Sequence, residues 1–205
     1  MYSLGGGCYV KWALDGIGMK RETQFFDYMW NLQGGLKTLV SIMKDDFTPF
    51  LDRTQYEYMN THTILNWDYF NIHKSYPDLA LMHYDTRNDD IFNSICRKVV
   101  RTRALFRDTT FKIFIYYRGY YKPSETVCTL QEESEYFVKE YSDMHNSNFV
   151  LVSLVEIPKE ESQNGTNITK PLKNTDKIYY DYVIRDDMDH WKYVVEKYKN
   201  LLMPS

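Results

Sequence analysis

Three glycines stand directly in front of a cysteine in the opening stretch MYSLGGGCYVKWALDG. Residues 1–4 have the pattern of a short strand, and from Cys8 onward apolar residues recur at helical spacing. We therefore predict a strand, a glycine loop and a helix, with Cys8 at the helix N-terminus. Unsatisfied backbone N–H groups and the helix dipole favour negative charge at that position. A thiol there would be biased toward the thiolate, which is the nucleophilic form.

Two other interpretations of this stretch compete with a nucleophile. A phosphate-binding loop of the GxGxxG type needs a third glycine where Val10 stands, and GxxxxGK[ST] is absent. A buried structural cysteine is the other interpretation, because free cysteine is among the most buried residue types. Consecutive glycines, however, are expected where the backbone turns sharply or approaches a ligand closely. Gly5, Gly6 and Gly7 therefore favour a functional loop, whose N–H groups could stabilise an oxyanion together with that of Cys8.

A thiolate nucleophile needs a general base within hydrogen-bond reach, and histidine is the usual one. His83 is the best candidate, because LALMHYD places it at the end of an apolar strand, where a sheet rim can present a side chain to a cleft. We expect Asp27 to orient this histidine, since an acid between Phe26 and Tyr28 needs a partner in apolar surroundings. The alternative is that Asp27 caps a helix. Asp85 is the second candidate for the orienting group.

These motifs resemble those of a family described as papain-like cysteine peptidases, an uncharacterised group in bacteria and large DNA viruses. That family begins with a serine-leucine-glycine stretch, a cysteine, a helix and a phenylalanine-aspartate-aromatic motif. The matching residues here are Ser3-Leu4-Gly5, Cys8 and Phe26-Asp27-Tyr28. The resemblance is dense over roughly the first third of the chain and implies a catalytic pair, not a substrate.

Later motifs follow the family's order. His83-Tyr84-Asp85 is similar to its histidine-aspartate pair, although Tyr84 separates the two residues and Met82 replaces a proline. A helix rich in basic residues comes next, and we expect its charges to form a solvated face paired with nearby acids. The apolar strand after it ends in Arg118, where open α/β sheets gather ligands, so Arg118 is a candidate ligand-binding residue. The basic positions that match are Arg97, Arg101 and Arg103.

Composition narrows the class of protein. A chain of 205 residues is long enough for one domain with a full core, and its net charge of −3 argues against a dedicated nucleic-acid binder. Cys8, Cys96 and Cys128 contain no CxxC spacing, which excludes a cysteine zinc site and a disulfide framework and favours a reducing compartment. We find no leader peptide and no apolar run of membrane-spanning length. The expectation is a cytoplasmic protein of the producing cell or of an infected host cell, with no metal, no cofactor and no membrane partner.

The rest of the chain alternates buried strands and amphipathic helices, which predicts a single α/β or α+β domain over residues 1–205. We expect a mixed sheet flanked by helices, with the polar segment 158–176 as a surface loop. A papain-like fold would instead divide into a helical half and a β-rich half, so we take the architecture from the pattern and the site from the motifs. The predicted helices are 36–47, 89–106, 124–145 and 186–202; the predicted strands lie around a turn at 74–77 and at 111–118, 148–158 and 177–184.

Three functional hypotheses follow. The first is a cysteine hydrolase or transferase acting on an amide, ester or thioester, with a peptide or protein as a possible substrate. The second is a non-catalytic module of the same fold that binds a host protein, a peptide or an anionic ligand through Arg118 and the glycine loop. The third is a metal-dependent sugar or phosphate transferase, which would need an acidic metal motif. Residues 186–189 hold the one acidic cluster, and as the opening of a helix it is more simply a capping run.

Overall fold

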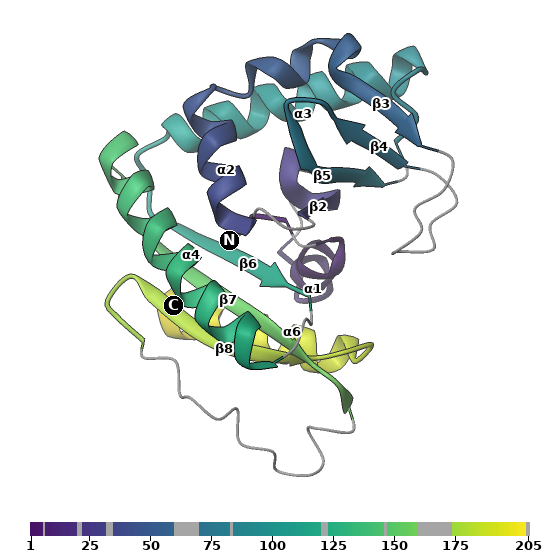
Figure 1. Ribbon diagram of the computed structural model, residues 1–205. Helices are drawn as coiled ribbons and strands as arrows, with labels where there is room; N and C mark the ends of the chain where they lie inside the picture. The colour runs from purple at the N-terminus through teal and green to yellow at the C-terminus, as the bar shows by residue number, and fades with distance from the viewer. Residues whose placement is uncertain are drawn as a thin grey trace.

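Two four-stranded sheets organise the part of the chain that the structure describes. The computed structural model is shown in Figure 1. One sheet is parallel and the other antiparallel, which confirms the α/β class. The strands predicted as a single mixed sheet are thus divided between two. The described residues are 1–5, 7–19, 22–31, 35–59, 70–82, 84–119, 123–145, 147–159 and 174–203.

The parallel sheet has the order β1-β6-β7-β8. Its strands are β1 (Tyr2–Ser3), β6 (Lys112–Arg118), β7 (Phe149–Ile157) and β8 (Ile178–Ile184). β6 and β7 are buried almost throughout, as expected for strands with both faces covered. Because all four strands run the same way, the glycine loop after β1 and the ends of β6, β7 and β8 meet at one edge of the sheet.

Helices cover both faces of this sheet (Figure 1). On one face lie α1 (Tyr9–Gly16) and α6 (Met188–Leu202), and on the other lies α4 (Pro123–Met144), with α2 (Gly35–Lys44) packed against it. The alternation along β6 divides the core accordingly. Its odd-numbered side chains join α1 and α6, and its even-numbered apolar ones join α4. The first group is Ile113, Ile115 and Tyr117, and the second is Phe114 and Tyr116.

The antiparallel sheet has the order β2-β5-β4-β3. Its strands are β2 (Met29–Asn31), β3 (Tyr56–Met59), β4 (Phe70–His73) and β5 (Tyr76–Met82), and the hairpin predicted around residues 74–77 joins β4 to β5. The helix α3 (Asp89–Arg107) packs against the 3₁₀ helices η1 (Phe25–Tyr28) and η2 (Thr48–Leu51). A third 3₁₀ helix, η3 (Arg53–Gln55), precedes β3 in a segment that the pattern did not assign. One apolar cluster contains residues of both sheets, so they share a core.

Side-chain caps explain where the longer helices begin. The Asn88 side chain accepts hydrogen bonds from the N–H groups of Asp90 and Ile91 at the start of α3, and Asp187 accepts one from His190 at the start of α6. The acidic run at 186–189 therefore caps a helix, as predicted. Within the described ranges, no group of three His, Cys, Asp or Glu residues is placed to hold a metal ion. No described helix is both long and apolar enough to span a membrane. Residues 160–173 of the predicted surface loop lie outside the described ranges.

Candidate functional site

Cys8 is the N-cap residue of α1, as the sequence predicts. Its carbonyl oxygen accepts the first helical hydrogen bond, from the Trp12 N–H at 2.9 Å. The side chain is half-buried, and this burial raises the pKa of the Cys8 thiol above its ordinary value, while a backbone hydrogen bond at Cys8 acts in the opposite direction. The predicted bias toward thiolate is therefore wrong for the protein without a substrate. Desolvation is the larger of these two effects on the Cys8 pKa, so burial favours the protonated thiol.

The glycine loop carries the chain from the parallel sheet to the edge of the antiparallel sheet. Gly5 and Gly7 have φ angles of +96° and +100°, in the left-handed region that favours glycine. The Gly7 N–H donates to the Met29 carbonyl at 3.0 Å, and a side chain at Gly5 would lie 3.4 Å from the same oxygen. The Gly5 N–H is bound by the Ser3 hydroxyl at 3.2 Å. These two N–H groups are engaged within the protein, and Gly6 lies outside the described residues. Among the described donors, the Cys8 N–H at the start of α1 is the one left for the predicted oxyanion role.

Asp27 lies in η1, on the segment against which the glycine loop packs. Its carboxylate is fully buried and accepts a hydrogen bond from the Gln24 N–H at 2.7 Å, so it caps the 3₁₀ helix. The alternative expectation, in which Asp27 is the N-cap of a helix that follows it, is wrong, because Gln24 is the N-cap and the strand β2 follows. The cap leaves the orienting role of Asp27 open, because one carboxylate can accept several hydrogen bonds.

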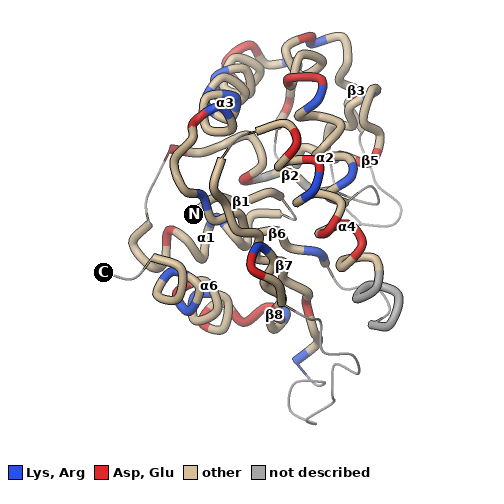
Figure 2. Tube along the Cα trace, turned by 90° about the vertical axis from the view of Figure 1, so that its left-hand side faces the viewer, with Lys and Arg blue, Asp and Glu red and all other residues tan. Residues whose placement is uncertain are grey.

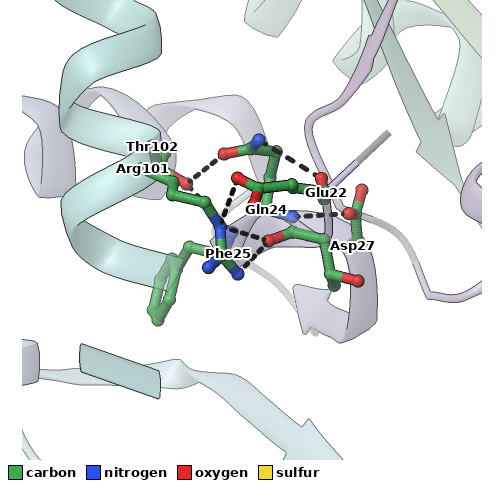
Figure 3. Close-up of polar contacts among 7 residues, drawn as sticks. Glu22, Gln24, Phe25, Asp27, Arg101 and Thr102 are labelled. Atoms are coloured by element: carbon green, nitrogen blue, oxygen red, sulfur yellow. Dashed lines mark hydrogen bonds and ion pairs between the residues drawn. The ribbon is translucent and has the colours of Figure 1, made fainter. Parts of the chain in front are cut away.

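Arg101 and Thr102 of α3 hold the segment that contains Asp27 (Figure 3). Together with Lys98, one turn before Thr102, they form a row of side chains on the helix. We call this row the α3 clamp. The Arg101 guanidinium donates to the Thr23 carbonyl at 2.6 and 3.1 Å. The Thr102 hydroxyl accepts from the Phe25 N–H at 2.9 Å and donates to the Gln24 side chain at 3.3 Å. Thr102 is fully buried, so this side of α3 binds protein rather than solvent.

Lys98 is the member of the α3 clamp that contacts Tyr84, the residue after His83 in the sequence. It is only 8% exposed, its ammonium group donates to the Tyr84 hydroxyl, and it lies 4.2 Å from the centre of the Tyr84 ring. Burial lowers the pKa of Lys98 to about 8, and the charge of Asp27 opposes this shift. Basic residues occur in the second half of α3, from residue 97 onward (Figure 2), and the expectation of a solvated face is wrong for Lys98. The sequence contains one signal of this burial, because Lys98 lies between Ile95 and Thr102 on the apolar stripe of the helix.

His83 lies outside the described residues. The strand that leads to it, β5, runs antiparallel to β2, with Leu81 opposite Met29. The chain that enters His83 therefore passes beside the chain that leaves Asp27. On the other side of His83, Tyr84 is held by Lys98 through its hydroxyl and by the Asn71 side chain through its carbonyl.

Asp85 faces a different partner. Its carboxylate accepts hydrogen bonds from Arg87 at 2.7 and 2.8 Å, and this side-chain contact lowers the pKa of Asp85. The Arg87 side chain is well exposed, so this pair belongs to the surface turn before α3. Of the two acids predicted to orient the histidine, Asp27 is fully buried and Asp85 is held by an exposed arginine.

Arg118 stands at the carboxyl end of β6, where the sequence places it. Its guanidinium forms an ion pair with Glu133 of α4, which is buried and also accepts a hydrogen bond from the Leu36 N–H at 3.3 Å. Arg118 is also hydrogen-bonded to Tyr116. An anionic ligand at Arg118 would therefore have to compete with a buried carboxylate, which no sequence pattern indicated.

A second polar cluster on the other face of the sheet was also missed. Glu156 of β7 is buried and accepts hydrogen bonds from the Tyr117 hydroxyl and from Arg185, the residue after β8. Next to it, the ring of Tyr9 stacks on Trp191 at 5.2 Å. The cluster lies at the carboxyl edge of the sheet beside the start of α1, and it forms only when three strands align.

Comparison with family models, curated proteins and solved structures finds no match to this chain. The functional argument therefore rests on the geometry around Cys8.

Proposed function

We propose that this chain is a cysteine-dependent hydrolase or transferase that acts on an amide, ester or thioester. In this proposal Cys8 is the nucleophile, His83 is the general base, and Asp27 orients the histidine. The observation that supports it best is the hydrogen bond from the Gly7 N–H to the Met29 carbonyl, since Met29 is also the residue paired with Leu81. That contact brings the loop of Cys8, the segment of Asp27 and the strand leading to His83 together.

Because burial raises the pKa of the Cys8 thiol, the proposed nucleophile depends on a neighbouring base to take its proton. His83 would take the thiol proton as the sulfur attacks the substrate carbonyl carbon. The Cys8 N–H would donate to the oxyanion that forms. The protonated His83 would then give its proton to the leaving group as the bond to that group breaks. Water, or another acceptor in a transferase, would release the acyl group from Cys8 with His83 again as base.

Resemblance to the papain-like cysteine peptidase family remains part of this proposal, as does a peptide or protein substrate. A nucleophilic thiol works in its reduced form, so we propose the cytoplasm as the compartment. The second candidate is a non-catalytic binding module. It is favoured by the N–H groups of Gly5 and Gly7, which are bound within the protein rather than facing a substrate.

The first experiment measures alkylation of the native protein by iodoacetamide across pH, with each cysteine followed separately by mass spectrometry. Cys96 is the internal control, because it is also half-exposed and burial also raises its pKa. We expect Cys8 to react faster than Cys96 and His83→Ala to slow Cys8 by about 10²–10⁴-fold, the usual contribution of a general base. Asp85→Asn should have little effect. If Cys8 and Cys96 react alike in the unmodified protein, the hydrolase proposal is wrong and the binding module takes its place.

A further inference from the structure

Two buried charged side chains, Asp27 of η1 and Lys98 of α3, act on each other. Asp27 is 0% exposed and Lys98 is 8% exposed, and the two attract each other electrostatically. Burial of an ion costs free energy that only pairing and hydrogen bonding offset. A methionine would fill a similar volume without that cost, so a buried ammonium group at this position points to a role besides packing.

The groups that act on the Lys98 ammonium come from three parts of the chain. Asp27 of η1 favours the ammonium form, whereas Arg97 and Arg101 of α3 itself oppose it. The third contact, from the segment after β5, is the Tyr84 hydroxyl, which accepts a hydrogen bond from Lys98. Lys98 thus joins the segment of Asp27 to the residue that directly follows His83.

We propose that Lys98 is a positioning residue of the cysteine site, whose positive charge holds Asp27 and Tyr84 in the arrangement that makes Cys8 reactive. The inference rests on the proposed function, because Asp27 matters to reactivity only if it orients the base. Lys98 acts through these two neighbours and does not contact the reacting atoms.

This role makes the reactivity of Cys8 sensitive to the protonation of a second group. Because burial lowers the pKa of Lys98 to about 8, its ammonium form gives way to the neutral amine as the pH rises through that value. Asp27 then loses its counter-charge. The rate of Cys8 alkylation should rise with pH while the thiol ionises, and it should level off or fall above about pH 8. The rate at Cys96 should continue to rise.

Three variants test the inference through the same alkylation assay. Lys98→Met removes the charge and should slow Cys8 by about 10- to 100-fold, the loss expected when a reacting group is displaced by about 1 Å. Lys98→Arg keeps the charge at all these pH values and should extend the fast reaction of Cys8 above pH 8. Arg107→Met removes an exposed positive charge near the end of the same helix, away from Lys98, so it is the matched control and should leave the profile unchanged. A folded Lys98→Met protein with the Cys8 profile of the unmodified chain would overturn the role of Lys98.

Two further measurements test the inference without using the reactivity of Cys8. In the unmodified protein labelled with [13Cε]lysine, one lysine resonance should titrate near pH 8, and Lys98→Arg should remove that resonance. In urea unfolding, Asp27→Asn and Lys98→Met combined should destabilise less than the sum of the two single changes.

Different experimental results would contradict the positioning role of Lys98 and the proposed function. Reactive Cys8 with additive effects at Asp27 and Lys98 would overturn the role of Lys98 and leave the hydrolase proposal intact. Coupled Asp27 and Lys98 with Cys8 no more reactive than Cys96 would overturn the proposed function, and with it the positioning role.

Discussion

At the scale of single residues, burial has opposite effects on the pKa values of acidic and basic groups. It raises the pKa of the Cys8 thiol and lowers that of Lys98, because desolvation favours the neutral form of each. The site therefore contains a thiol that resists ionisation and an amine that loses its charge near pH 8. The same reasoning applies away from the site, at a histidine of the antiparallel sheet.

His73 is fully buried among Phe50, Tyr56 and Tyr76, and its Nδ1 atom has no hydrogen-bond partner among the described residues. Burial lowers the pKa of His73 below its ordinary value of 6.5. Below pH 6.5 the unfolded chain therefore binds a proton that the folded chain resists, and the free energy of unfolding falls as the pH falls. Each unit of pKa depression contributes at most about 1.4 kcal/mol.

We expect His73→Phe to flatten this acid limb, measured as the free energy of urea unfolding between pH 8 and pH 5. Part of the slope should remain, because the pKa of His145 is lowered by burial as well. A variant that keeps the full slope of the unmodified protein would show that His73 does not contribute to it.

At the scale of elements, α3 supports the candidate site because it carries the α3 clamp. Its first turn depends on the Asn88 side chain, which accepts hydrogen bonds from Asp90 at 2.9 Å and Ile91 at 3.2 Å. Acidic residues in that first turn and Arg107 in the last turn also match the helix dipole. Loss of the cap should fray the end of α3 that lies nearest to Asp85, not the turn that holds the segment of Asp27.

Asn88→Ala should therefore lower the free energy of unfolding by about 1 kcal/mol while the alkylation profile of Cys8 stays unchanged. Asn93→Ala, an exposed position inside α3, is the control and should be neutral or slightly stabilising because alanine is the better helix former. Chemical denaturation of both variants checks the difference. Equal effects of the two substitutions would contradict a capping role for Asn88.

At the scale of the whole molecule, Glu133 connects three elements from distant parts of the chain. It belongs to α4, pairs with Arg118 of β6 and accepts a hydrogen bond from Leu36 at the start of α2. Gly35 makes room for it: a side chain there would place Cβ 1.9 Å from a Glu133 carboxylate oxygen. Gly35 also has a φ angle of +53°, which an alanine adopts only with strain.

Gly35→Ala should destabilise the protein more than Gly18→Ala. Gly18 also has a positive φ, of +77°, but a side chain there meets nothing within 4 Å, so its substitution measures the backbone strain alone, about 1–2 kcal/mol. The excess at Gly35 should approach the roughly 3–5 kcal/mol that a broken buried ion pair costs. Denaturant unfolding of the two variants gives the comparison. Equal losses would mean that Glu133 can move without leaving Arg118.

Local patterns in the sequence were enough to identify the long helices and strands and their order, but not the short strands β2 and β3. The helix after Cys8, the hairpin at 74–77, α3 and the three long strands of the parallel sheet each follow from periodicity, turn residues and caps within a short window. The α/β class follows from their alternation.

Other features depend on which distant segments meet, and only the folded chain reveals them. The division into two sheets, the Arg118–Glu133 pair and the burial of Lys98 are of this kind. Their energies come from desolvation and from partners far away in sequence, and neither can be read from the types of neighbouring residues.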